Sequence, residues 1–175
     1  EAARLGFDAI ELFTEKPSAG EPGELTQLLD EHGLALGAVG TGAGKVLHGL
    51  TLTDPNKEIR QEAISFIQNM INFGAMHSAP AIIGSMQGNH GDGISSEVAL
   101  SWLGEALEHL GQYACNKGVS LIYEPLNRYE TNLFNSYLGA CDFIDQLSTN
   151  GVSLLADLFH MNIEEANIAE VIKTG

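Results

Sequence analysis

The sequence has few basic side chains. Lysine and arginine together number 8 in a chain of 175 residues, against 23 aspartates and glutamates, and the formal net charge is −15. Binding to a phosphate backbone depends on many cationic side chains, so this balance argues against it and favours a small-molecule or metal ligand. We therefore expect no nucleic-acid partner.

Cysteine and long apolar segments are also scarce. Cys115 and Cys141 lie in helical patterns without the spacing of a zinc site or a disulfide framework, and they predict buried thiols in a reducing compartment. No apolar run is long enough to cross a bilayer, and no secretory signal pattern is visible. We expect a cytoplasmic protein without a membrane partner.

What the sequence does contain is a repeated pattern of helix, glycine and apolar strand. Glycine often follows the last turn of a helix because it adopts the left-handed conformation without penalty. The pattern occurs at Gly6, Gly33, Gly118 and Gly151, with a variant at Gly74. It predicts five helix-to-strand junctions, and strands that alternate with single helices form parallel βαβ units.

Capping signals indicate where the intervening helices begin. Asp54 and Pro55 predict an N-cap followed by proline at the first helical position. Another helix is expected to begin near Ser95. Two more are predicted towards the end of the chain, one over residues 133–148 and one from Ile163 to the C-terminus.

Both an open doubly wound sheet and a barrel would satisfy this alternation. Polar, glycine-rich loops follow the carboxyl end of every predicted strand, at residues 14–22, 40–54, 85–95, 125–132 and 158–162. Functional residues spread over all strand ends are typical of a (β/α)8 barrel, whereas an open sheet concentrates them at one switch point. We therefore predict an α/β protein with the (β/α)8 TIM-barrel fold.

The predicted barrel is incomplete. A barrel of this type has eight strands and about 250 residues. The chain supplies five predicted strands, opens within a predicted helix and has no initiator methionine. We expect residues 1–175 to form a single partial TIM-barrel domain with about strands 2 to 6, lacking the first strand and the last two βα units.

Two acidic residues occupy equivalent positions at the ends of two successive strands. Residues 118–124 and 151–157 align one by one. This alignment predicts that Glu124 and Asp157 share one register and one face of neighbouring parallel strands. Converging carboxylates indicate a metal site or an acid–base pair, although each could instead cap the following helix or pair with a lysine. Such ligands suit Mn²⁺, Mg²⁺, Co²⁺ or Zn²⁺ and do not choose among them.

Other polar residues follow the same strands. His160 lies three residues after Asp157, where a substrate hydrogen bond and a metal role both remain open. Glu130, taken alone, is a surface acid that pairs with Arg128. Arg128 and His48 are further candidates for substrate binding, although a solvent-exposed loop position is the simpler interpretation of His48.

Two segments carry a resemblance to a known family. Glu124-Pro-Leu-Asn-Arg-Tyr-Glu130 and Asp157-Leu-Phe-His-Met-Asn162 resemble the xylose-isomerase-like TIM-barrel superfamily. Within it, the sequence is most similar to sugar (or sugar-phosphate) isomerases and epimerases, such as the ketose 3-epimerases and hydroxypyruvate isomerases. The resemblance implies that Glu124 is a metal ligand and a catalytic carboxylate, Asp157 a second ligand, and Glu130 and His160 substrate-binding residues.

The resemblance also implies a reaction. A divalent-metal-dependent isomerase or epimerase of this family removes a proton α to a carbonyl of a sugar or sugar phosphate and passes through an enediolate. The family's other ligands, a histidine after the seventh strand and a glutamate after the eighth, have no counterpart in this sequence. The glutamate is the second acid/base, so activity of this polypeptide alone is left open.

Two alternative functions remain at this point. One is an abasic-site endonuclease-like enzyme of the same fold, and the other is a non-catalytic sugar-binding barrel. The −15 charge opposes the endonuclease, because that function needs a basic DNA-binding face. Oligomeric state is open, and a homo-oligomer is among the options.

Overall fold

A computed structural model describes residues 1–15, 22–91 and 93–175. Most of the predicted loop at residues 14–22 therefore lies outside the described residues. Five parallel strands form one sheet, in which each strand pairs with the next strand of the sequence. The strands are β1 (Ala9–Phe13), β2 (Ala35–Gly40), β3 (Ala81–Ile83), β4 (Leu121–Tyr123) and β5 (Val152–Leu154). This sequential parallel order is that of an arc of a TIM barrel, which confirms the predicted fold class.

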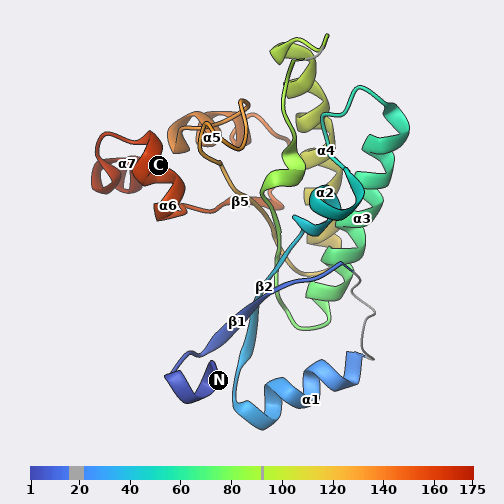
Figure 1. Cartoon of the computed structure of the whole chain (residues 1–175), viewed down its shortest axis with the longest axis vertical. Helices are drawn as coiled ribbons and strands as arrows, with labels where there is room; N and C mark the ends of the chain where they lie inside the picture. The colour runs from blue at the N-terminus through green and yellow to red at the C-terminus, as the bar shows by residue number, and fades with distance from the viewer. Residues whose placement is uncertain (16–21, 92) are drawn as a thin grey trace.

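Helices connect the strands, and α3 and α4 lie side by side along one flank of the sheet (Figure 1). The helices are α1 (Pro22–His32), α2 (Ala43–His48), α3 (Lys57–Ala75), α4 (Ser96–Asn116), α5 (Tyr137–Ile144), α6 (Leu158–Glu164) and α7 (Ile168–Thr174). Two 3-10 turns are η1 (Ala3–Leu5) and η2 (Ser85–Gln87).

The predicted start of α3 was wrong by two residues. Asn56 is the N-cap, and its Oδ1 accepts a hydrogen bond from the N–H of Glu58 at 2.9 Å. Asp54 instead accepts from the N–H of Asn56 at 2.7 Å, which makes a turn before the helix. The prediction for α4 is confirmed, because Ser95 caps it.

The predicted helices at the end of the chain were too long. Ser136 caps α5, so this helix covers only the middle of the predicted range 133–148. The last helix was predicted from Ile163 to the C-terminus, but α6 begins earlier, after the cap Asp157, and ends at Glu164, and Asn167 caps a separate helix, α7. Cap residues in the extended conformation thus break a pattern that appeared continuous.

Glycine serves two different purposes at the helix-to-strand junctions. Gly33 ends α1 with a φ of 62°, in the left-handed region that glycine adopts readily. Gly151 precedes β5 for reasons of space, because a Cβ there would overlap the carbonyl oxygen of Gly111 in α4. Both allow a strand to start directly after the polypeptide leaves the helix layer.

The hydrophobic core fills the space between the sheet and the α3–α4 pair. Its fully buried side chains include Ile67 and Ile71 of α3, Leu103 and Leu107 of α4, and strand residues such as Val39, Ile83 and Leu121. Every helix in the described part of the chain is too short or too polar to cross a bilayer. The cysteines differ from the prediction, since Cys141 is only half-buried and Cys115 is exposed.

Candidate active site

Glu124 follows β4 directly, and its backbone is held on both sides. Its N–H donates to the carbonyl of Ile83 at 2.9 Å, which continues the β3–β4 ladder by one residue. Its carbonyl accepts from the side-chain amide of Gln87 at 3.0 Å. Gln87 is fully buried and is fixed in turn by the hydroxyl of Tyr123, which donates to its Oε1 at 2.6 Å. Sequence reasoning did not find Gln87, because nothing in its local pattern marks a buried amide.

Asp157 lies three residues after the end of β5 and not opposite Glu124, where the sequence predicted it. Leu121 pairs with Val152 and Tyr123 with Leu154, so Leu155 rather than Asp157 continues the ladder opposite Glu124. The predicted register was therefore wrong by two residues. Because side chains alternate with a period of two, a shift of two residues leaves the predicted face unchanged.

The helix-capping alternative also holds for Asp157. Its Oδ1 accepts a hydrogen bond from the N–H of Phe159 at 2.6 Å, at the first turn of α6. The cap fixes the side chain at the strand end with one carboxylate oxygen engaged. Capping and ligation are therefore compatible for this residue, since a carboxylate has two oxygens.

Glu124, Asp157 and His160 come together at the ends of β4 and β5. Each offers one ligand atom, and these atoms all lie within 4.8 Å of one another. The Nε2 atom of His160 is 3.7 Å from Oε1 of Glu124. Two carboxylates and an imidazole at this spacing are a set of donors that could bind a divalent cation.

When no cation lies between them, the carboxylates of Glu124 and Asp157 repel each other if both are ionised. The pKa of Glu124 is raised to about 7, mainly by burial and then by the negative charge of Asp157 and a hydrogen bond to it. Glu11 and Glu130 add smaller contributions of the same sign. Below about pH 7 Glu124 therefore holds a proton when no cation is bound. A cation would fit in place of that proton.

Asn127 fixes the ring of His160, which is only 8% exposed. The backbone N–H of Asn127 donates to Nδ1 at 3.1 Å, and the side-chain nitrogen of Asn127 is 2.8 Å from the same atom. A backbone N–H can only donate, so Nδ1 is the acceptor and the proton of the neutral ring is on Nε2. This tautomer favours a hydrogen bond from Nε2 to a substrate oxygen over metal ligation by Nε2.

The remaining predicted residues divide into two groups. Glu130 accepts from the side chain of Asn127 at 2.8 Å and lines the same cavity as Glu124. Arg128 instead points to α6, where its Nη2 lies 2.7 Å from Oε2 of Glu164. His48 ends α2 with its Nε2 3.5 Å from Oε1 of Glu15, outside the residues that line the cavity. The structure thus brings Glu130 into the cluster but not Arg128 or His48.

The strand ends enclose a cavity of 210 Å³. Its lining includes Glu124, Glu130 and His160, together with Glu11 and Phe13 of β1, which sequence reasoning did not select. The signal for Glu11 was its place in a strand between the apolar residues Ile10 and Leu12.

Glycines keep the cavity open. A Cβ on Gly84, directly after β3, would come within 2.8 Å of Oε2 of Glu124. A Cβ on Gly42 would come equally close to the ring of Phe13, at 2.8 Å from its Cε2. The side chains of Glu124 and Phe13 therefore occupy the space that these two glycines leave free.

A family model described as "Xylose isomerase-like TIM barrel" matches residues 1–174. An L-ribulose 3-epimerase of Methylomonas sp. (strain DH-1) is 29% identical, with 98% of this chain and 59% of the relative aligned. A D-psicose 3-epimerase of Agrobacterium fabrum is 26% identical, with 100% of this chain and 62% of the relative aligned. The chain thus spans about three fifths of the length of these curated relatives.

Solved structures agree with the fold. The chain is 26% identical to a D-psicose 3-epimerase from Clostridium cellulolyticum H10 whose structure contains D-tagatose, with a TM-score of 0.84 over 99% of this chain and 61% of the other. An AP endonuclease, family 2, from Brucella melitensis is 17% identical with a TM-score of 0.82 over 99% of this chain and 66% of the other. At that identity the second match is evidence of the fold alone.

Proposed function

We propose that this chain, which belongs to the xylose isomerase-like TIM barrel family, contributes a catalytic carboxylate and metal ligands to a divalent-metal-dependent sugar isomerase or epimerase. The observation that carries the proposal is the convergence of Glu124 and Asp157 at the ends of two adjacent strands. Relatives described as ketose 3-epimerases support sugar chemistry.

The carboxylates of Glu124 and Asp157 would hold the cation. Their oxygens suit Mn²⁺, Mg²⁺, Co²⁺ or Zn²⁺, and the proton that Glu124 holds marks the position at which positive charge is favourable. A bound divalent cation would supply Lewis-acid stabilisation of negative charge on the carbonyl and neighbouring hydroxyl oxygens of an open-chain sugar.

Glu124 is the proposed base. Its carboxylate takes the proton from the carbon next to the carbonyl: the C–H bond breaks, an O–H bond forms on Glu124, and the electron pair leaves an enediolate. A carboxylate that binds the cation through one oxygen can accept this proton through the other. A proton returned to the opposite face gives an epimer, and one returned to the adjacent carbon gives an isomer. That proton comes from a second acid outside this set.

His160 and Glu130 are the proposed substrate-binding residues. With Nδ1 accepting from Asn127, His160 presents Nε2–H as a donor to a substrate oxygen near the reacting carbon. Glu130 faces the same cavity and is oriented by the side-chain amide of Asn127. One residue, Asn127, therefore orients both.

The cavity favours a free sugar over a sugar phosphate. Within the described residues its lining includes three glutamates, Glu11, Glu124 and Glu130, and neither lysine nor arginine. Phosphate binding normally uses such cations or a ring of backbone N–H donors. Arg128 is close in sequence to Glu124 and Glu130 and could be considered as a phosphate-binding residue, but it is paired with Glu164.

The test uses the full-length protein loaded with Mn²⁺. Interconversion of D-fructose and D-psicose, or of other ketoses and their 3-epimers, is followed by chromatography before and after treatment with EDTA. We expect EDTA to abolish turnover and added Mn²⁺ to restore it. Failure to convert any ketose with Mn²⁺, Mg²⁺ or Co²⁺ would overturn the proposal, and binding of abasic duplex at low salt would favour the endonuclease instead.

A further inference from the structure

The β1 side of the cavity has no part in the chemistry above. We propose that Glu11 and Phe13 form a subsite for the non-reacting end of the sugar, and that they determine which ketoses the site accepts. This inference rests on the proposed function, because it assigns a role within the same cavity.

The strand places both side chains on one face. Glu11 is paired with Ala38 of β2, and Phe13 with Gly40. The intervening residue Leu12 is half-buried and packs against the hydrophobic core. Because side chains alternate along a strand, Glu11 and Phe13 point away from the helices and line the cavity.

Gly40 lies next to both side chains and lines the same cavity. A Cβ on Gly40 would lie 3.5 Å from Oε1 of Glu11 and 3.4 Å from Cδ2 of Phe13. The carboxylate and the ring therefore border one open region above the end of β2. A hydroxylated carbon chain in that region would meet a hydrogen-bond acceptor on one side and an apolar surface on the other.

The carboxylate of Glu11 has no hydrogen-bond or ion-pair partner among residues 1–15, 22–91 and 93–175. It is also outside the group of three residues whose ligand atoms lie within 4.8 Å of one another. Glu11 is therefore free to accept a hydrogen bond but is not positioned as a ligand with Glu124 and Asp157. A sugar hydroxyl distant from the reacting carbon matches that position.

Phe13 supplies the apolar half of the subsite. Its side chain is 64% exposed, although large aromatic side chains are usually covered in folded proteins. The ring lies beside Gly42, where a Cβ would come within 2.8 Å of its Cε2. An exposed aromatic face offers contact to the C–H groups of a sugar.

The experiment combines variants of the enzyme with variants of the substrate. In the full-length, Mn²⁺-loaded protein, Glu11→Ala and Glu11→Gln are compared with wild type, and Glu62→Gln on the exposed surface of α3 is the charge-matched control. Ketose affinity is measured by calorimetry, and kcat and KM are measured for a ketohexose and its 4-, 5- and 6-deoxy forms. Phe13→Leu is measured in the same way.

We expect Glu11→Ala to weaken ketose binding about 10- to 100-fold, because a hydrogen bond to a charged group is lost. Glu11→Gln should lose less, since it keeps an acceptor, and Phe13→Leu only a few-fold. One deoxy substrate should bind wild type more weakly, and the same deletion should cost nothing in Glu11→Ala. The control variant Glu62→Gln should bind both ketose and Mn²⁺ as wild type does.

The two proposals fail in different ways. Ketose affinity within about twofold of wild type in Glu11→Ala, or unchanged deoxy penalties, would overturn the subsite even if wild type is an active epimerase. Ketose binding that depends on Glu11 without turnover in wild type would overturn the proposed function and keep the subsite. Absence of ketose binding to wild type would overturn both.

Discussion

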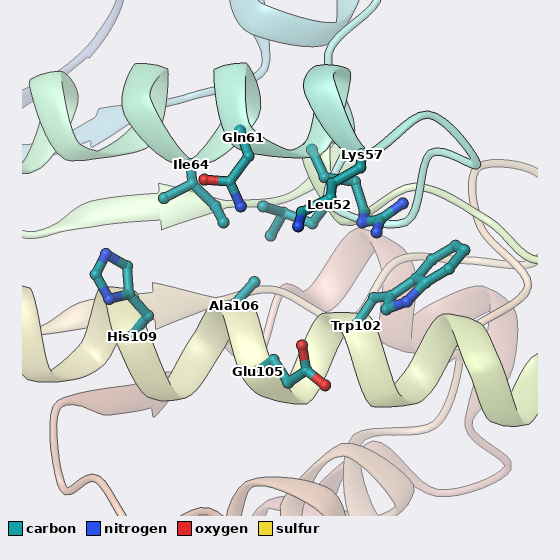
Figure 2. A pocket seen from close by; sticks show the side chains of 9 residues that line it. Leu52, Lys57, Gln61, Ile64, Trp102, Glu105, Ala106 and His109 are labelled. Atoms are coloured by element: carbon teal, nitrogen blue, oxygen red, sulfur yellow. The ribbon is translucent and has the colours of Figure 1, made fainter.

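Two hollows of the molecule have opposite chemistry. The cavity at the strand ends has a volume of 210 Å³, and a groove between α3 and α4 has a volume of 280 Å³ (Figure 2). Figure 2 shows Lys57, Gln61 and Ile64 facing Trp102, Glu105 and His109 across this groove. The groove is the larger of the two, and it contains charges of both signs.

Two of the polar groups that line the α3–α4 groove, Arg60 and His109, have partners. The guanidinium of Arg60 lies 3.8 Å from the ring centroid of Trp102, and its Nη1 donates to the carbonyl of Asp54 at 2.7 Å. Gln68 and His109 are joined across the two helices at 3.0 Å. At the strand ends, in contrast, Glu11, Glu124 and Glu130 line one cavity, and the described part of that lining contains neither lysine nor arginine. An excess of acidic groups, rather than volume, distinguishes the candidate active site from the α3–α4 groove, which carries charges of both signs.

The largest effect should come from removing the proposed base. We expect Glu124→Gln in the full-length enzyme to lower kcat/KM for ketose epimerisation by about 10³-fold, because the amide cannot accept the proton. Glu105→Gln, the matched change in the α3–α4 groove, should leave kcat/KM within about twofold of wild type. Near-normal turnover by Glu124→Gln would remove the distinction between the two hollows.

The second effect concerns metal binding and pH. A cation must displace the proton held by Glu124, whose pKa is raised to about 7. The apparent Mn²⁺ affinity should therefore rise about tenfold per pH unit below that pKa and level off above it. Calorimetric titrations at about pH 5.5, 6.5 and 7.5 would measure this. Glu124→Gln should lose the pH dependence, and a pH-independent affinity in wild type would contradict the account.

The same pKa carries a consequence for stability without metal. Its folded-state value is raised from 4.5, so the stabilisation from this group is fully present below about pH 4.5 and is lost as pH rises through about 7. Thermal unfolding of the metal-free protein should show a lower Tm at pH 8 than at pH 6 relative to Glu124→Gln. Added Mn²⁺ should reverse the difference, and equal pH profiles of the two proteins would contradict it.

A smaller effect should follow from loosening His160. Asn127→Ala removes a side chain next to Nδ1 of His160 but keeps the backbone donor, so we expect kcat/KM to fall about tenfold. Asn132→Ala is the control, because its side chain bonds to the backbone of His90 instead. Nitrogen chemical shifts of His160 should show the Nε2–H tautomer in wild type and in Asn127→Ala. An Nδ1–H tautomer in wild type would reverse the assignment of His160 as a donor through Nε2.

The smallest effect should come from the α3–α4 groove. Arg60→Met keeps an apolar stem over Trp102 and removes the guanidinium, so we expect a loss of about 1 kcal/mol in unfolding free energy. Turnover should not change. A drop in activity without loss of stability would show that this groove has a function of its own.

Short-range features of the sequence were enough to predict the alternation of strands and helices. Gly33 and Ser95 mark ends and starts through local backbone conformation and capping, and both predictions are confirmed. The start of α3 was wrong because Asp54 and Asn56 are both good caps, and only the turn between them decides which one is used. The convergence of Glu124 and Asp157 was predicted from aligned segments; the register was wrong by two residues, but one ligand atom of each residue lies within 4.8 Å of the other.

The sequence by itself determined the parallel α/β alternation and the two strand-end carboxylates, because hydrophobic period, glycine junctions and caps act between near neighbours in the chain. Only the tertiary structure decided that Arg128 turns to Glu164 and that Glu11 faces the cavity of Glu124. These relations join residues more than 30 positions apart. They depend on strand stagger and on the space that Gly84 leaves for Glu124, which no local pattern records.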